Sequence, residues 1–260
     1  MLFKSAAIAF SMYSRLPVPQ IEWDEANMKY VFCFFPLIGV FAGALEAGWY
    51  FLACYAGIHS FFYAAVSILI IILLTGGIHL DGYMDVHDAS AAFSDMEKKH
   101  KIMKDPHTGA FAVIHSCLYM LLTAGIFAQT YATGEYKYIL IIALGYSISR
   151  SLCVFHLLTI PSANHSGVGY IFQTGAGKST VLITQIVYIV ACLTAIAFLS
   201  VWTALFIAVL LPCLMLRLRF YIKKQFGGIT GDLAGFSLVV TELSIGFVIV
   251  LEICLKGVLG

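Results

Sequence analysis

Long apolar runs separated by short polar segments dominate the chain. Seven of these runs are about as long as the roughly 20 residues that a helix needs to cross a bilayer. They cover residues 31–53, 58–80, 110–132, 138–160, 180–199, 200–217 and 233–255. The last pair comes from one uncharged stretch, which is too long for a single crossing and is expected to turn near Ser200. The pattern predicts an all-α, polytopic integral membrane bundle of about seven transmembrane helices.

The ends of the chain and its composition fit the same interpretation. The first residues, MLFKSAAIAFSMY, predict an uncleaved helix lying against the membrane, because the apolar run is short and no cleavage-site pattern follows it. The chain is 61% hydrophobic and 11% charged, far from the composition of a soluble domain. With a net charge of +1 it has no basic surface for nucleic acid. We expect a single membrane domain over residues 1–260.

The distribution of lysine and arginine predicts the orientation of the helices. If the loop of Lys98, Lys99, Lys101 and Lys104 is cytoplasmic, alternating crossings place nearly all other basic residues on that same side. The N-terminus and the polar segments 75–109, 161–179 and 226–232 are then cytoplasmic, and the C-terminus is external. We therefore expect a protein of the plasma (inner) membrane with its chemistry on the cytoplasmic face.

An acidic cluster at the end of the second run carries the strongest chemical signal. In TGGIHLDGYMDVHDA (75–89), Asp81, Asp85 and Asp88 are spaced i, i+4 and i+7, which places them on one helical face. Such a group of carboxylates needs a cation, and hard oxygen ligands favour Mg²⁺ over zinc. The alternative is a solvated helix end that is neutralised by the lysines of residues 98–104.

Other polar patches are predicted to reach the same membrane face. Asp105 precedes Pro106 at the start of the third run, so it is expected to cap that helix, to join the metal site, or to do both. Asp232 could likewise cap the last helix or bind the metal. QTGAGKST (173–180) resembles a phosphate-binding loop, but Phe172 stands where that motif needs glycine. Lys178 could still reach a phosphate.

Several of these segments together resemble the cobalamin synthase family, the adenosylcobinamide-GDP ribazoletransferases. The similar elements are RLPVP (15–19), FFPLIGVFAG (34–43), TGGIHLDGYMDVHDA (75–89), MKDPHTGAFAV (103–113), Arg150 and GGITGDLAGFSLVVTEL (227–243). They follow in order over nearly the whole chain. Ala89 and Ala112 stand where the family usually has glycine, while the carboxylates are retained.

The resemblance implies a Mg²⁺-dependent enzyme of cobalamin biosynthesis. It would join adenosylcobinamide-GDP to α-ribazole, or to α-ribazole 5′-phosphate, and release GMP when a ribose hydroxyl attacks the cobinamide-linked phosphorus. Expected partners are these substrates and membrane lipid, with no nucleic acid. Other cobalamin-assembly enzymes, or a second copy of the chain, are further candidate partners.

The same resemblance gives provisional roles to individual residues. His79 or one of the aspartates would be the general base, with Asp81 and Asp85 at the catalytic centre. The metal ligands would be Asp81, Asp85, Asp88, Asp105 and Asp232. Substrate-binding residues would be Lys104, His107, Gly109, Arg150, Lys178, Gly228 and Thr230, with the basic residues among them neutralising the departing GMP.

Two other functions remain as alternatives. A CDP-alcohol phosphotransferase also uses several aspartates on membrane helices, but its D-G-x-x-A-R signature is absent after Asp81. An ion-coupled transporter would use intramembrane carboxylates such as Glu46 and Glu242, although this chain gathers most of its acids at one face.

Overall fold

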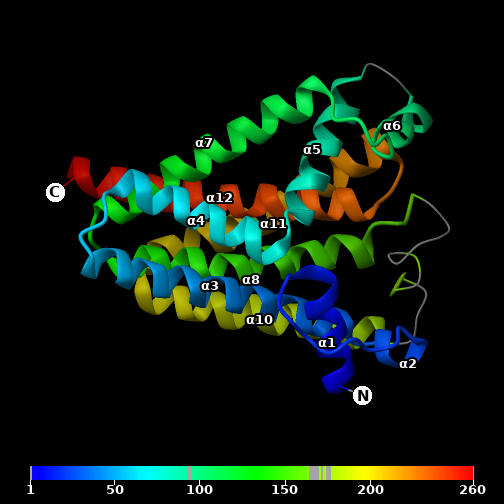
Figure 1. Ribbon diagram of the computed structural model, residues 1–260, viewed down its shortest axis with the longest axis horizontal. Helices are drawn as coiled ribbons and strands as arrows, with labels where there is room; N and C mark the ends of the chain where they lie inside the picture. The colour runs from blue at the N-terminus through cyan, green and yellow to red at the C-terminus, as the bar shows by residue number, and fades with distance from the viewer. Residues whose placement is uncertain (1, 93–94, 164–169, 171, 174–176, 260) are drawn as a thin grey trace.

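The computed structural model describes residues 2–92, 95–163, 170, 172–173 and 177–259, and these residues form a bundle of long helices (Figure 1). Residues 164–169 of the polar segment 161–179, and residues 174–176 of the QTGAGKST segment, lie outside the described residues. In chain order the helices are α1 (Leu2–Tyr13), α2 (Glu25–Met28), α3 (Val31–Tyr55), α4 (Ser60–Thr75), α5 (Ile78–Ala91), α6 (Met96–Ile102), α7 (Ala110–Ala132), α8 (Tyr136–Thr159), α10 (Lys178–Leu199), α11 (Val201–Phe226) and α12 (Gly231–Leu259).

The predicted all-α membrane fold is confirmed. Six helices (α3, α7, α8, α10, α11 and α12) are long and apolar enough to cross a membrane, and the bent pair α4 and α5 brings the number to as many as seven. The short apolar helix at the N-terminus is present as α1. Figure 1 shows the two ends of the chain at opposite ends of the bundle.

The second predicted run, 58–80, differs from the structure. α4 ends at Thr75, and α5 continues after a 95° bend. Gly76 and Gly77 both have positive φ, at 66° and 79°, a conformation that ends a helix and that glycine adopts without strain. Hydropathy alone extended the run through this turn because Ile78 and Leu80 are apolar.

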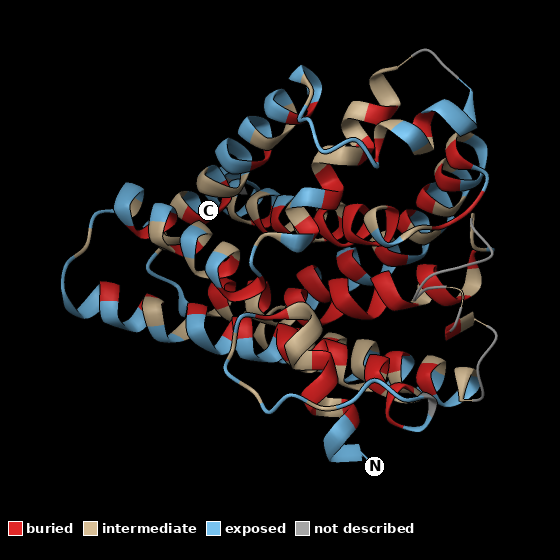
Figure 2. Ribbon diagram, turned by 45° about the vertical axis from the view of Figure 1, so that its right-hand side comes forward, coloured by how far each residue is buried: buried red, intermediate tan, exposed pale blue. Residues whose placement is uncertain are grey.

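Helix α8 forms the centre of the bundle. Its buried residues run from Tyr138 to Leu158, and Figure 2 shows buried residues gathered inside while the outer helices carry exposed ones. The exposed side chains of α4, α7, α10 and α11 include large apolar groups such as Phe61, Leu121, Phe198 and Val209. In a chain of this hydropathy, such a surface suits lipid contact.

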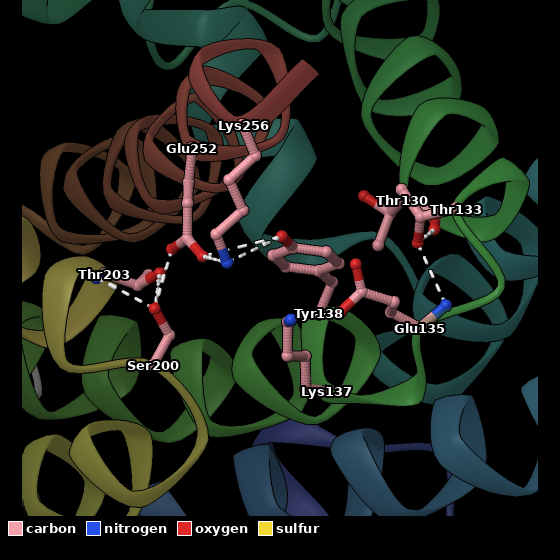
Figure 3. A network of polar contacts seen from close by, with 9 residues as sticks. All are labelled: Thr130, Thr133, Glu135, Lys137, Tyr138, Ser200, Thr203, Glu252 and Lys256. Atoms are coloured by element: carbon pink, nitrogen blue, oxygen red, sulfur yellow. Dashed lines mark hydrogen bonds and ion pairs between the residues drawn. The ribbon is translucent and has the colours of Figure 1, made fainter. Parts of the chain in front are cut away.

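Polar contacts fix the end of the bundle that carries the C-terminus (Figure 3). The buried Glu252 of α12 accepts hydrogen bonds from Ser200 at 2.9 Å and from Lys256 at 2.5 Å. Ser200 is the N-cap of α11 and follows the last residue of α10. The predicted division of the long apolar stretch at Ser200 is therefore confirmed.

Small residues let α3 pack tightly on α8. A Cβ atom added at Gly39 would lie 2.5 Å from the backbone oxygen of Tyr146, and one at Gly43 would lie 2.7 Å from the Cβ of Ala143. Glycines four residues apart are a common way for membrane helices to approach closely.

We expect Gly39→Ala to destabilise the protein by about 1–3 kcal/mol, because the added methyl meets backbone that cannot move aside. The matched control is Gly48→Ala on the same helix, where nothing lies within 4 Å of the added Cβ. This control should be neutral or up to about 1 kcal/mol more stable, since alanine favours the helix. Thermal unfolding in detergent measures both variants, and equal melting temperatures would contradict the expectation.

Candidate active site

The turn between α4 and α5 sets the direction of the acidic helix. Thr75 accepts a hydrogen bond from the backbone N–H of Gly77 at 3.3 Å, and α5 starts at the next residue. Gly77 has no side chain that could cap α5. The first N–H groups of α5 are therefore left without a side-chain acceptor at the N-cap, at a helix end that carries partial positive charge.

A second glycine brings α5 against the beginning of α12. A Cβ atom at Gly82 would lie 2.8 Å from the backbone oxygen of Asp232, which leaves no room for a side chain. The contact places Asp81 and Asp85 beside Asp232. At the start of α12, Thr230 accepts a hydrogen bond from the N–H of Leu233 at 3.3 Å. Thr230 therefore caps α12, and the alternative that Asp232 is the cap was wrong.

The aspartates of α5 act on one another electrostatically. Burial, together with the nearby charges of Asp81, Asp232 and Asp88, raises the pKa of Asp85 to about 6. Neither Asp81 nor Asp85 makes a side-chain hydrogen bond or ion pair with another described residue. Both carboxylates are therefore available to bind a cation.

The lysines of residues 98–104 do not together neutralise the aspartates of α5. Lys99 donates to Gln225 of α11 at 2.5 Å, and Lys101 pairs with Glu97 within α6 at 2.7 Å. Lys104 is exposed and lies close enough to Asp232 to act on its charge. The alternative of a helix end neutralised by these lysines is therefore not favoured, although Lys104 does belong to the surroundings of the site.

Asp88 connects α5 to α7. Its two carboxylate oxygens accept hydrogen bonds from the N–H groups of Gly109 at 2.7 Å and Ala112 at 3.2 Å. A Cβ atom at Gly109 would lie 2.0 Å from one of these oxygens, so a side chain there would displace the carboxylate. Asp88 thus satisfies donors at the start of α7, and its predicted role as a metal ligand stays a prediction.

The prediction that Asp105 caps the third long helix was wrong. α7 begins at Ala110, and the carboxylate that reaches its first turn comes from α5. Asp105 instead accepts hydrogen bonds from the backbone N–H of His107 at 2.9 Å and from its ring at 2.7 Å. These bonds lower the pKa of Asp105. Both residues are exposed, and their predicted metal and substrate roles stay predictions.

Two cavities flank the N-terminal end of α5. The first, of about 640 Å³, is polar and is lined by Ser11, Arg15, the Thr75–Gly77 turn and Asp81, among others. The second, of about 400 Å³, is mostly apolar and is lined by aromatic residues (Tyr13, Trp23, Phe32 and Phe35), with His79 and Asp232 among its polar groups. Met12 and Ile78 border both cavities. Arg15 and the aromatic residues had no role in the sequence-based prediction.

His79 lies deep in the wall of the apolar cavity. Its ring packs 5.7 Å from the ring of Phe35 and 6.3 Å from that of Tyr13, and its buried Nε2 has no hydrogen-bond partner among the described residues. Burial, with a smaller contribution from Arg150, lowers the pKa of His79 to about 3. The imidazole is therefore neutral near pH 7 and a weak base.

Arg150 lies in the interior of the bundle and borders neither large cavity. It donates to Glu242 at 3.0 Å and to the backbone oxygen of Tyr146 at 2.8 Å, and it is fully buried. Glu242 of α12 is therefore paired with a cation of α8. The carboxylate of Glu46 is buried without a hydrogen-bond partner among the described residues.

Two other predicted substrate-binding residues, Lys178 and Gly228, line neither of the two cavities. Lys178 is the first residue of α10, which packs on α3, α8 and α11. Gly228 lies against backbone: a Cβ atom there would be 2.5 Å from the oxygen of Pro161, beside the isolated parallel bridge between Ser162 and Ile229. The substrate roles of Lys178 and Gly228 stay predictions.

The available carboxylates suit a magnesium ion better than a metal that is held entirely by protein side chains. Among the described residues, no three His, Cys, Asp or Glu side chains already form a metal-binding group. Mg²⁺ ordinarily takes one or two protein carboxylates and completes its shell with water and substrate phosphate. Asp81 and Asp85, whose carboxylates are available, fit that requirement.

Comparisons with known proteins give the family of the chain. The sequence profile described as cobalamin-5-phosphate synthase matches residues 5–250. The adenosylcobinamide-GDP ribazoletransferase of Lachnoclostridium phytofermentans is 39% identical over 250 residues, covering 94% of this chain and 92% of the relative. The enzyme of the same name from Clostridium botulinum (strain Alaska E43 / Type E3) is 34% identical over 247 residues, covering 93% and 95%. No solved structure matches the chain significantly. The chain therefore belongs to the cobalamin-5-phosphate synthase family.

Proposed function

We propose that this protein is an adenosylcobinamide-GDP ribazoletransferase, which joins adenosylcobinamide-GDP to α-ribazole or α-ribazole 5′-phosphate and releases GMP. The observation that carries the proposal is the meeting of α5 and α12 beside two cavities, one partly polar and one mostly apolar, in a chain of this family. The polar cavity suits phosphate groups, and the aromatic cavity suits the flat base of α-ribazole. A CDP-alcohol phosphotransferase is not favoured by any of these findings.

Mg²⁺ is the proposed cofactor, with Asp81 and Asp85 as its principal ligands. When bound, the ion would neutralise the pyrophosphate and the charge that develops on the departing GMP. Asp232 lies beside both ligands through the contact at Gly82 and could orient water in the metal shell. Asp88 holds the start of α7 in place behind them.

The general base is better assigned to a carboxylate than to His79. Burial lowers the pKa of His79 to about 3, far below neutral pH. Efficient proton acceptance needs a pKa near the working pH. We therefore assign His79 to binding the acceptor in the apolar cavity, and a site carboxylate that does not bind the ion to drawing the proton from its hydroxyl.

The proposed orientation in the membrane rests on where the basic residues lie along the bundle. α1, α6 and the starts of α7 and α12 lie at one end, away from the C-terminus (Figure 1). We place that end in the cytoplasm and the bundle in the plasma membrane, because most lysines and arginines lie there. Lys104, whose charge acts on Asp232, is a candidate to neutralise the departing GMP.

The first test is GMP release by purified protein. We expect wild type to release GMP from adenosylcobinamide-GDP and α-ribazole only with Mg²⁺ present, and EDTA to abolish the release. Asp81→Asn should lower the turnover by about 10²–10³-fold and raise the Mg²⁺ concentration needed for half-maximal rate, because one anionic ligand is lost. Glu97→Gln, at an exposed carboxylate on α6, is the matched control.

Normal Mg²⁺-dependent turnover in Asp81→Asn would refute the metal assignment. Ion uptake by sealed vesicles, with no GMP released by wild type, would instead indicate a transporter.

The second test concerns the bond between α5 and α7. We expect Asp88→Ala and Gly109→Ala each to lower the free energy of unfolding by about 1–2 kcal/mol, because each removes the carboxylate from the N–H groups at the start of α7. Gly125→Ala in the middle of α7, where nothing lies within 4 Å of the new methyl, is the control and should not be destabilised. If thermal unfolding gives the same loss for all three variants, the capping role of Asp88 is wrong.

A further inference from the structure

Arg15 is fixed over the glycine turn that precedes α5. Its backbone N–H donates to the oxygen of Leu74 at 2.7 Å, which ties the segment after α1 to the end of α4. Its side chain covers the turn, since a Cβ atom at Gly76 would lie 2.4 Å from Nε of Arg15. The guanidinium therefore lies in the wall of the polar cavity of about 640 Å³, which Asp81 also lines.

The charge of Arg15 is not matched within the described residues. The side chain forms no ion pair there, although Asp81 lines the same cavity, and the residue is exposed. This contrasts with Arg150, which is buried against Glu242. An unpaired guanidinium in a cavity is available to an anion, and its planar fork suits phosphate oxygens.

The same cavity also receives the uncapped N-terminus of α5. Gly77, Ile78 and Leu80 line it, and no side chain accepts from the N–H groups of the first turn. The N–H of Asp81 is already bonded to the oxygen of Gly77. The free donors are therefore backbone N–H groups of the residues before Asp81. They lie at the positive end of the helix dipole, which favours a bound anion.

We propose that the polar cavity is a phosphate-binding subsite in which Arg15 and the N-terminus of α5 hold the pyrophosphate of adenosylcobinamide-GDP. The inference rests on the proposed function and adds a binding residue to it. The pyrophosphate is favoured over the 5′-phosphate of the acceptor because Asp81, the proposed Mg²⁺ ligand, lies in the same wall, and the ion would then be shared between protein and pyrophosphate.

Steady-state kinetics test the subsite with Arg15→Gln, Arg15→Lys and the control Arg217→Gln, which removes an exposed arginine of α11. With α-ribazole as acceptor, Arg15→Gln should raise the KM for adenosylcobinamide-GDP by roughly 10- to 100-fold, as expected for the loss of a charged hydrogen bond. Arg15→Lys should fall between this variant and wild type, and Arg217→Gln should match wild type.

The choice of acceptor identifies the source of the phosphate. A higher KM for adenosylcobinamide-GDP with either acceptor supports the pyrophosphate. A higher KM for α-ribazole 5′-phosphate alone, with adenosylcobinamide-GDP and α-ribazole unaffected, keeps the subsite and overturns its assignment to the pyrophosphate. If no KM changes in Arg15→Gln, the subsite itself is wrong.

Calorimetric titration with Mg²⁺ and inorganic pyrophosphate separates this inference from the proposed function. We expect the Kd of Arg15→Gln to be at least about 10-fold weaker than that of wild type, with unchanged thermal unfolding, because Arg15 contributes its backbone N–H to the fold in every variant. Wild type that binds pyrophosphate through Arg15 but releases no GMP would overturn the proposed function alone. Wild type that releases GMP, beside an Arg15→Gln variant that binds pyrophosphate equally well, would overturn the subsite alone.

Discussion

The site depends on one backbone constraint, the pair of left-handed residues Gly76 and Gly77. A residue with a Cβ adopts positive φ at a cost of about 1 kcal/mol or more, so two in succession are practical only for glycine. The turn bends the chain by 95° and releases α5 from the direction of the bundle. Without that bend α5 would continue in the direction of α4 and would not lie against the start of α12.

Once α5 leaves the bundle, two close contacts fix its position. Gly82 allows the start of α12 to approach, and Asp88 bonds to the first turn of α7 across Gly109. Each contact uses a glycine as the partner of an aspartate-bearing segment, which explains why glycine and aspartate recur together in this part of the chain. The acidic helix α5 is therefore held by α7, which follows it closely in the chain, and by α12, which is distant in sequence.

The sequence predicted what depends on local pattern and missed what depends on a distant partner. The apolar runs, the division at Ser200 and the shared helical face of the α5 aspartates follow from composition and spacing alone. Asp105 carried the local signature of a cap, yet Asp88 reaches α7 instead, because only the tertiary structure shows which carboxylate is near. Arg15 and Arg150 likewise look alike in sequence, and their partners distinguish them: one has an open cavity and the other has Glu242.

The first two turns of α5 explain how one short helix can bind a substrate that needs both positive and negative protein groups. A pyrophosphate requires donors for its oxygens and a divalent cation for its charge, and that cation in turn requires carboxylates. The uncapped N-terminus and Arg15 supply the donors, while Asp81 stands in the first turn, where a carboxylate also stabilises the helix dipole. Asp85 follows one turn later on the same face. Positive and negative groups therefore lie within about one helical turn of each other, and an anion bound with its cation satisfies both, whereas either ion alone leaves one of them uncompensated.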